Sequence, residues 1–293
     1  MKDHMMSARL RRLKKWCLII TLLVVSPIGV TWADPALLDR KAALRSALEQ
    51  SLPGLDVTEM SEDEVIPGWW QLDVKTRSGN KVVYVDTKGR YILVGSVFDL
   101  KTGHNLTRQR LVTQRARIFA EIDWSMAIMA NGRPLEHGAS RPQRPLLYFT
   151  DPDCPYCQRF QPEIRKLVRA GYRVAVLLFP SERQHPDAPR KAASIWCAKD
   201  RMLALESALR REKVSDPDVS CSLPPLEAIR DLAKQFGITG TPSLVLPGGE
   251  VIRGFQSAEA ILTWLERSAD KQRPTNLMSI NDVANEGGIN GEK

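Results

Sequence analysis

Two cysteines separated by two residues are the strongest chemical signal in this sequence. Cys154 and Cys157 follow an apolar run at 146–150, so the Cys-Pro-Tyr-Cys segment begins a helix where a strand ends. At a helix N-terminus, unpaired backbone N–H groups and the positive end of the helix dipole stabilise a thiolate. Pro155 suits the first helical position, because proline has no N–H to lose there. Thiolate is the attacking form in disulfide exchange, so we expect Cys154 to be the nucleophile and Cys157 the resolving cysteine.

Two other roles are open to such a cysteine pair, namely half of a zinc site and an inert structural disulfide. Zinc sites usually need four nitrogen or sulfur ligands. The sequence has no second Cys-x-x-Cys, and its four histidines are scattered. We therefore expect no metal and no cofactor, with the structural disulfide as the remaining alternative.

Residues 1–33 have the pattern of a secretory signal peptide. A basic region that ends at Lys15 is followed by ten apolar residues, and Thr31-Trp32-Ala33 offers a small-x-small cleavage site. The apolar run falls short of the roughly 20 residues that a membrane-spanning helix needs. We expect cleavage before Asp34 and export, with an uncleaved membrane anchor as the alternative.

Loss of this segment changes both the charge and the cysteine count. It carries six Lys or Arg and one Asp, so the formal net charge falls from +8 to +3, and we expect no nucleic-acid partner. Five cysteines become four, and an even number in an exported protein favours pairs. We expect Cys197 and Cys221 to form a structural disulfide, with a second redox pair as the alternative.

The elements before the cysteine pair form a small unit of their own. A helix is expected over 36–50, and strand-like runs at 68–75, 81–86 and 91–98 are separated by Gly-containing turns. Such a meander is marginally stable alone, and its strand edges need cover, which a partner chain can provide. A linker helix over 105–123, capped by Asn105, follows. Its basic face is either a solvated surface or a docking surface.

The second unit alternates strands and helices around the cysteine pair. The order is strand, helix, strand, helices, hairpin, helix, which predicts an α/β domain of thioredoxin type with a helical insertion. The expected elements are a strand at 146–150, helix 154–170, strand 172–179, a mostly helical stretch 187–236, strands 243–246 and 251–254, and helix 257–268. Residues 131–145 are expected to form a loop and residues 273–293 a disordered tail.

These segments together resemble the DsbC/DsbG family of periplasmic thiol:disulfide interchange proteins. The matching motifs are Phe149 to Cys157, the Ile-Trp-Cys-Ala-Lys-Asp run at 195–200, and Gly-Ile-Thr-Gly-Thr-Pro at 237–242. The resemblance implies that Pro242 is cis and faces the active cysteines. It also implies that Thr241, Pro242, Tyr156 and Pro155 contact the substrate.

The resemblance further implies a disulfide isomerase or reductase that acts on exported proteins with wrong disulfides in the periplasm. A transmembrane thiol reductant of the DsbD type would keep its cysteines reduced. A holding chaperone and a dithiol oxidase are the alternatives. The expected organisation has five parts: 1–33 signal peptide, 34–104 N-terminal homodimerisation domain, 105–125 linker helix, 126–272 thioredoxin-like catalytic domain, and 273–293 tail.

Two features depart from the family pattern. Pro155-Tyr156 between the cysteines is similar to the DsbG branch, whereas Trp-Cys-Ala-Lys-Asp at 196–200 is similar to DsbC. The position six before the first cysteine, a buried acid in thioredoxin, is Tyr148. The group that takes the Cys157 proton therefore cannot be named from the sequence.

Overall fold

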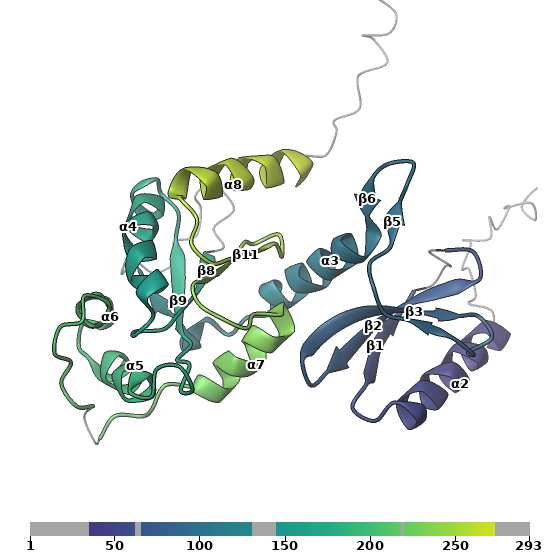
Figure 1. Cartoon of the computed structure of the whole chain (residues 1–293), viewed down its shortest axis with the longest axis horizontal. Coiled ribbons are helices and arrows are strands. Elements are labelled where there is room, and N and C mark those ends of the chain that lie inside the picture. The colour runs from purple at the N-terminus through teal and green to yellow at the C-terminus, as the bar shows by residue number, and fades with distance from the viewer. Residues whose placement is uncertain (1–34, 62–65, 131–144, 218–219, 273–293) are drawn as a thin grey trace, which may run out of the picture. The chain divides into compact units, whose positions relative to one another are not determined.

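The computed structural model describes residues 35–61, 66–130, 145–217 and 220–272 (Figure 1). The expected signal peptide, the 131–145 loop except for its last residue, and the 273–293 tail lie outside these residues. The chain divides into two compact units, residues 1–47 and 48–293. The described part of the first unit is helical and belongs to α2 (Pro35–Ser51), which matches the helix expected from the sequence.

The second unit opens with a four-stranded antiparallel sheet in the order β1-β2-β3-β4. Its strands are β1 (Asp56–Met60), β2 (Trp69–Thr76), β3 (Gly79–Asp86) and β4 (Ile92–Leu93). A tight turn joins β2 to β3, with Thr76 paired to Gly79, and φ of 110° at Gly79 favours glycine there. The sequence did not predict β1, in which Val57 is the one fully buried side chain.

The predicted strand over 91–98 is wrong in extent. Only Ile92 and Leu93 pair with β3, and the chain then forms a separate two-stranded ribbon of β5 (Phe98–Asp99) and β6 (His104–Asn105). The strand predicted over 81–86 is confirmed as part of β3, in which Val82 to Val85 are all buried. Both faces of this strand are therefore covered.

Helix α3 (Leu106–Ala120) begins as predicted, with the Asn105 side chain accepting a hydrogen bond from the backbone N–H of Arg108 at 2.8 Å. Its basic face is neither wholly solvated nor free for docking. Arg110 binds the buried carboxylate of Asp73 at 2.8 Å and that of Glu59 at 2.6 Å. Arg117 binds Glu59 at 2.6 Å. Two of the arginines thus hold the helix against strands β1 and β2.

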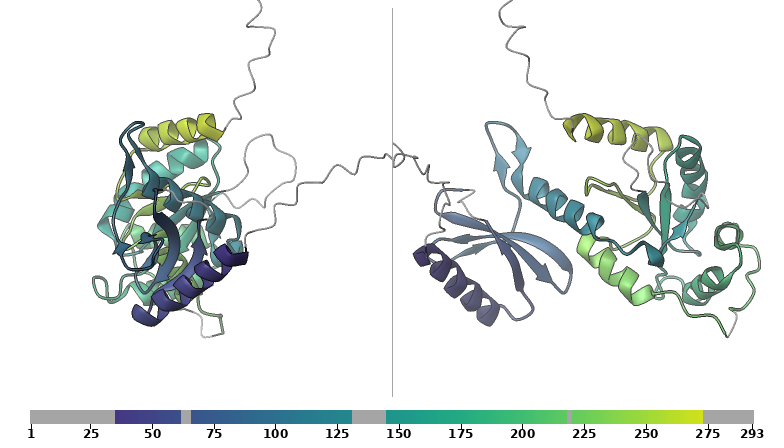
Figure 2. Two further views of the ribbon diagram at one scale, coloured as in Figure 1. Left: turned by 90° about the vertical axis from the view of Figure 1, so that its right-hand side faces the viewer. Right: turned by 180° about the vertical axis from the view of Figure 1, so that it is seen from behind.

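The cysteine pair follows the central strand of a five-stranded sheet with the order β11-β10-β8-β9-β7, in which β8 and β9 are parallel. Figure 2 shows the described chain from two further directions. The strands are β7 (Ile128–Met129), β8 (Leu146–Thr150), β9 (Val174–Leu178), β10 (Ser243–Val245) and β11 (Val251–Arg253). The helices are α4 (Pro155–Arg169), α5 (Ala188–Cys197), α6 (Arg201–Leu209), α7 (Leu226–Phe236) and α8 (Ala258–Gln272). The predicted strands, hairpin and helices are confirmed, whereas the two-residue strand β7 was not predicted.

Strand β8 is buried on both faces, so its side chains alternate between two halves of the core. Leu146 and Tyr148 pack with residues of α4, α5, α6 and α8. Leu147 and Phe149 pack with α7 and with Phe119 at the end of α3. Helices thus cover both faces of the sheet, which is the thioredoxin-like α/β arrangement that the order of elements predicted. Among the described residues, no helix has the length and apolar character to cross a bilayer.

Candidate active site

The cysteine pair lies where β8 passes into α4. The strand ends at Thr150, a short turn follows, and Cys154 is the N-cap residue of the helix with Pro155 in its first turn. Both cysteines are reduced, and they are 6% and 0% exposed. Cys157 is therefore one turn inside the helix and in the core, whereas Cys154 lies at its N-terminal end. This is the placement that the sequence predicted.

The two thiols have opposite acidities. The pKa of Cys154 is lowered to about 5, chiefly because the Cys157 side chain hydrogen-bonds its sulfur. Burial opposes this change, and contacts with Thr241 and with the backbone N–H groups of Cys157 and Tyr156 support it. The pKa of Cys157 is raised, first by burial and then by the neighbouring Cys154. At neutral pH, Cys154 is thus a thiolate and Cys157 a thiol, as nucleophile and resolving group require.

Thr241, which precedes Pro242, lies against Cys154 although the two are 87 residues apart in the sequence. The peptide bond between them is cis, as the resemblance implied. The Sγ of Cys154 is 3.5 Å from the carbonyl oxygen of Thr241. Pro242 immediately precedes β10, which pairs antiparallel with β8. The sheet therefore brings this segment beside the cysteine pair.

A cavity of about 760 Å³ opens in front of Cys154. Its walls include three predicted site residues, Pro155, Tyr156 and Thr241. They also include residues that the sequence analysis missed: residues 179–185, Arg230, Thr239 and Gly240. Residues 179–185 follow β9, which runs parallel to β8. Because the carboxyl ends of parallel strands meet at one edge of a sheet, their place beside Cys154 could have been expected from the two predicted strands.

A buried carboxylate fixes the turn before Cys154. Asp151 is 0% exposed and accepts hydrogen bonds from the backbone N–H groups of Asp153 and Ser181, both at 2.8 Å. Its second carboxylate oxygen also lies 2.9 Å from Nδ1 of His185. Asp153 in turn pairs with Lys191. These bonds hold the turn before Cys154 against the cavity wall, and none of them was expected from the sequence.

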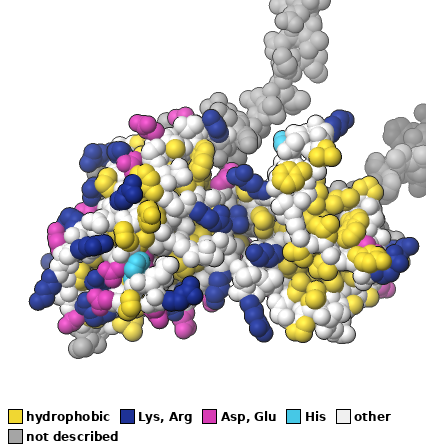
Figure 3. All heavy atoms as spheres, viewed as in Figure 1, with side chains coloured by type: hydrophobic (Ala, Val, Ile, Leu, Met, Phe, Trp, Pro, Cys, Tyr) yellow, Lys and Arg dark blue, Asp and Glu magenta, His cyan; other side chains and the backbone are white. Residues whose placement is uncertain are grey.

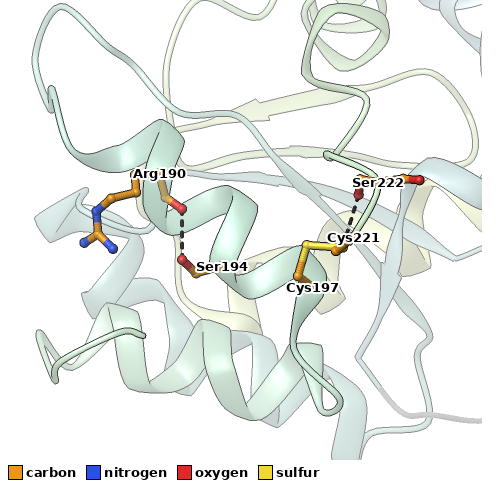
Figure 4. The surroundings of a disulfide bond; sticks show 5 residues. All are labelled: Arg190, Ser194, Cys197, Cys221 and Ser222. Atoms are coloured by element: carbon orange, nitrogen blue, oxygen red, sulfur yellow. Dashed lines mark hydrogen bonds between the residues drawn. A yellow bond between two sulfur atoms is a disulfide. The ribbon is translucent and has the colours of Figure 1, made fainter. Parts of the chain in front are cut away.

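The other two cysteines of the described chain form a disulfide at the end of α5 (Figure 4). Cys197 and Cys221 are 24 residues apart, and their Cα atoms are separated by 5.8 Å. The expected pairing is confirmed. Ser194 and Arg190 lie about one and two turns before Cys197, respectively, on the same helix (Figure 4). Within the described residues, no group of three or more His, Cys, Asp or Glu side chains is arranged to hold a metal ion.

Fold and site together define a class of protein. A thioredoxin-like domain that places a dithiol at a helix N-terminus, with one acidic and one buried thiol beside a cis-proline, is a thiol–disulfide oxidoreductase. Comparison with known proteins narrows the class. Residues 35–108 match the family model of the disulfide bond isomerase N-terminal domain, and residues 137–269 match that of a thioredoxin-like domain.

Relatives of known name cover nearly the whole chain. A thiol:disulfide interchange protein DsbC of Salmonella typhimurium is 28% identical over 256 residues, which is 87% of this chain and 96% of the relative. DsbC of Escherichia coli K12 is 25% identical over the same shares. A disulfide interchange protein of Neisseria gonorrhoeae, known from a crystal structure, is 30% identical over 50% of this chain and 97% of its own, with a TM-score of 0.39.

The two family models and the curated relatives agree. The chain belongs to the DsbC/DsbG family of thiol:disulfide interchange proteins. It is an enzyme of the protein disulfide isomerase and thiol–disulfide oxidoreductase class.

Proposed function

We propose that this protein corrects wrong disulfides in exported proteins, with Cys154 as the nucleophile and Cys157 as the resolving cysteine. The observation that carries the proposal is the acidity of the pair. The thiol at the helix N-terminus has a pKa of about 5, and the buried thiol one turn later has a raised pKa. At neutral pH only Cys154 of this pair is a thiolate, so only one of the two cysteines can attack the substrate first.

The reaction begins when the Cys154 thiolate attacks one sulfur of a wrong substrate disulfide. A Cys154–substrate disulfide forms, the substrate S–S bond breaks, and the electron pair leaves on the second substrate sulfur as a thiolate. The freed substrate thiolate can attack a different substrate disulfide, and a later substrate thiolate displaces Cys154. Alternatively, Cys157 displaces the substrate, and the enzyme becomes oxidised and must be reduced again.

The cavity in front of Cys154 is the proposed substrate site. Thr241, Pro155 and Tyr156 line it or border the nucleophile, and Tyr156 is 57% exposed. The Thr241 carbonyl already touches the Cys154 sulfur, so a substrate chain bound along the Thr241-Pro242 segment lies next to the reacting atom. An exposed aromatic ring suits an apolar side chain of an incompletely folded substrate.

We also propose that the chain forms a homodimer through residues 34–104, the N-terminal part of the expected domain organisation. The match of residues 35–108 to the disulfide isomerase N-terminal domain supports this. So does an exposed apolar surface, since Tyr91, Val94, Phe98 and Leu100 are each more than half exposed. Hydrophobic side chains gather on the right-hand part of Figure 3, where Figure 1 shows strands β1 to β3 and the ribbon of β5 and β6. A sheet edge with such side chains favours association.

The proposed place of action is the periplasm, because residues 1–33 have the pattern of a cleaved signal peptide. Isomerase chemistry requires a reduced Cys154, and an oxidising compartment requires a continuous source of electrons. A transmembrane thiol reductant of the DsbD type is the proposed donor.

The test is reactivation of scrambled ribonuclease by residues 34–293 in a mild thiol buffer. Cys154→Ala is expected to reduce the rate to that of the buffer alone, whereas Cys157→Ala retains part of the activity and accumulates mixed disulfides. The matched control is the double variant Cys197→Ala/Cys221→Ala, which removes two cysteines outside the site and is expected to keep its activity when assayed below its melting temperature. Full activity in a folded Cys154→Ala variant contradicts the proposal.

One observation favours a second function, that of a dithiol oxidase. A thiolate with a pKa of about 5 stabilises the reduced enzyme, which makes its disulfide more oxidising. An oxidase has no need of a dimerisation domain, so a monomer on gel filtration, together with rapid oxidation of reduced ribonuclease, would favour this function over the isomerase.

A further inference from the structure

Two hydroxyl side chains of β8 lie in the core on the side of the cysteine pair. Tyr148 and Thr150 are two residues apart in the strand, so they face the same side of the sheet, and both are 0% exposed. Tyr148 belongs to the core cluster that also contains Cys154 and Cys157. Its ring meets the ring of Phe160, one turn after Cys157 on α4, edge to face with a centroid distance of 5.4 Å.

Neither hydroxyl forms a hydrogen bond of good geometry in the reduced enzyme. The Oη of Tyr148 and the Oγ1 of Thr150 are both buried without such a bond, although the phenol interacts with the Thr150 hydroxyl and the Cys157 thiol. Buried polar groups are nearly always bonded, so two such hydroxyls beside a reactive thiol need an explanation. A phenylalanine and a valine would fill the same volume without this cost.

The phenol and the thiols affect each other electrostatically. The pKa of Tyr148 is raised far above its ordinary value, mainly by burial, and negative charge on Cys157 and Cys154 raises it further. The Thr150 hydroxyl opposes this change. Tyr148 therefore keeps its proton throughout the working range, and a protonated phenol beside a sulfur anion is a hydrogen-bond donor.

We propose that Tyr148 donates a hydrogen bond to the Cys157 thiolate when Cys157 attacks the mixed disulfide at Cys154. This inference rests on the proposed roles of the two cysteines. In the reduced enzyme, Cys157 is a thiol that bonds the Cys154 thiolate, and the phenol has no anion to bind. Formation of the mixed disulfide removes the negative charge of Cys154. Burial then becomes the main obstacle to ionisation of Cys157, and the Tyr148 hydroxyl offsets it.

The step balances without any further reagent. Cys157 gives its proton to solvent, and its sulfur attacks Cys154. The Cys154–Cys157 bond forms as the Cys154–substrate bond breaks, and the electron pair leaves on the substrate sulfur, which takes up a proton. Tyr148 keeps its own proton from beginning to end. Thr150 is a positioning residue, because its hydroxyl orients the phenol and does not touch the reacting sulfur.

The two cysteine steps can be timed separately with dithiobis-nitrobenzoate, an aromatic disulfide whose released thiolate is coloured. Reduced enzyme is expected to release one equivalent when Cys154 attacks and a second when Cys157 resolves the adduct. Cys157→Ala is expected to release only the first. A single release from the wild type, or a second release from Cys157→Ala, overturns the proposed cysteine roles and not the role of the tyrosine.

Tyr148→Phe removes only the hydroxyl. Because a hydrogen bond to a charged group contributes more than a neutral one, the second release is expected to slow by about tenfold, with its pH dependence moved about one unit to the alkaline side. The first release is expected to stay within about twofold. The matched control is Tyr84→Phe, since Tyr84 is also 0% exposed but bonds Thr107 at 2.6 Å in the N-terminal sheet. Both of its releases are expected at wild-type rates.

An unchanged second release in folded Tyr148→Phe overturns the proposal, and so does equal slowing of both releases. Thr150→Val provides an independent test if Tyr148→Phe fails to fold. Slowing confined to its second release supports the proposal, whereas wild-type rates in both releases overturn it.

Discussion

The acidity of Cys154 is predicted to depend on Cys157. Among the causes of its low pKa, the hydrogen bond from the Cys157 side chain is the largest, and it lowers the pKa from 9.0 to about 5 together with Thr241 and the N–H groups of the first helical turn. Cys157→Ala removes the largest cause and leaves the others. A hydrogen bond to a charged group contributes about 1.5–3 kcal/mol, which corresponds to about one to two pKa units. The pKa of Cys154 is therefore expected to rise to about 6–7 in the variant.

The pKa of Cys154 is measured from the ultraviolet absorbance of its thiolate as a function of pH. The rate of alkylation by iodoacetamide at each pH is a second measurement. Wild-type enzyme and Cys157→Ala are compared, and Cys154→Ala supplies the baseline. A pKa in Cys157→Ala equal to that of the wild type would refute the reasoning, because the helix N-terminus would then account for the whole effect.

The low pKa of Cys154 also makes the free energy of unfolding of the reduced protein fall as the pH falls. The pKa of Cys154 is lower in the folded protein than in the unfolded chain, so its contribution is fully present above the unfolded value near 9.0 and is lost as the pH falls through about 5. The reduced wild type is therefore expected to lose free energy of unfolding relative to Cys154→Ala as the pH falls from 9 towards 5. Thermal melts across this range measure the difference.

Two further changes test contacts outside the active site. Arg110→Ala leaves the Asp73 carboxylate buried without its partner and is expected to lower the free energy of unfolding by about 3 kcal/mol. Arg117→Ala removes an exposed ion pair and is expected to lower it by less than about 1 kcal/mol. Denaturant titration compares the two variants, and equal losses would contradict a larger contribution from the buried pair. The Cys197–Cys221 disulfide joins positions 24 residues apart, and replacing both cysteines by alanine is expected to lower the free energy of unfolding by about 3 kcal/mol. An unchanged melting temperature would argue against a structural role for this disulfide.

The sequence by itself determined the features that depend on neighbouring residues. Cys154 at the end of a strand, followed by Pro155, specified a reactive cysteine at a helix N-terminus, and the structure has this geometry. Asn105 as a helix cap and the hairpin of β10 and β11 were predicted for the same reason. A cap, a turn or an amphipathic run involves only a few consecutive residues, so their types are enough to specify it.

A very short strand could not be predicted from the sequence. β7 contains only Ile128 and Met129, and its pairing with β9 gives it strand structure. The surroundings supplied by a distant segment, and not the local pattern, decided its conformation.

Only the tertiary structure decided what surrounds the reactive sulfur atoms. Thr241 reaches Cys154 across 87 positions of sequence because β10 pairs with β8. Ser181 and His185 reach Asp151 because β9 lies parallel to β8. Tyr148 stands in the sequence where thioredoxin has a buried acid, and its burial in the core that holds Cys157 underlies the role proposed for its hydroxyl. The local sequence chooses the reactive groups, whereas the pairing of distant strands sets the burial, charge and hydrogen bonding that determine their acidity.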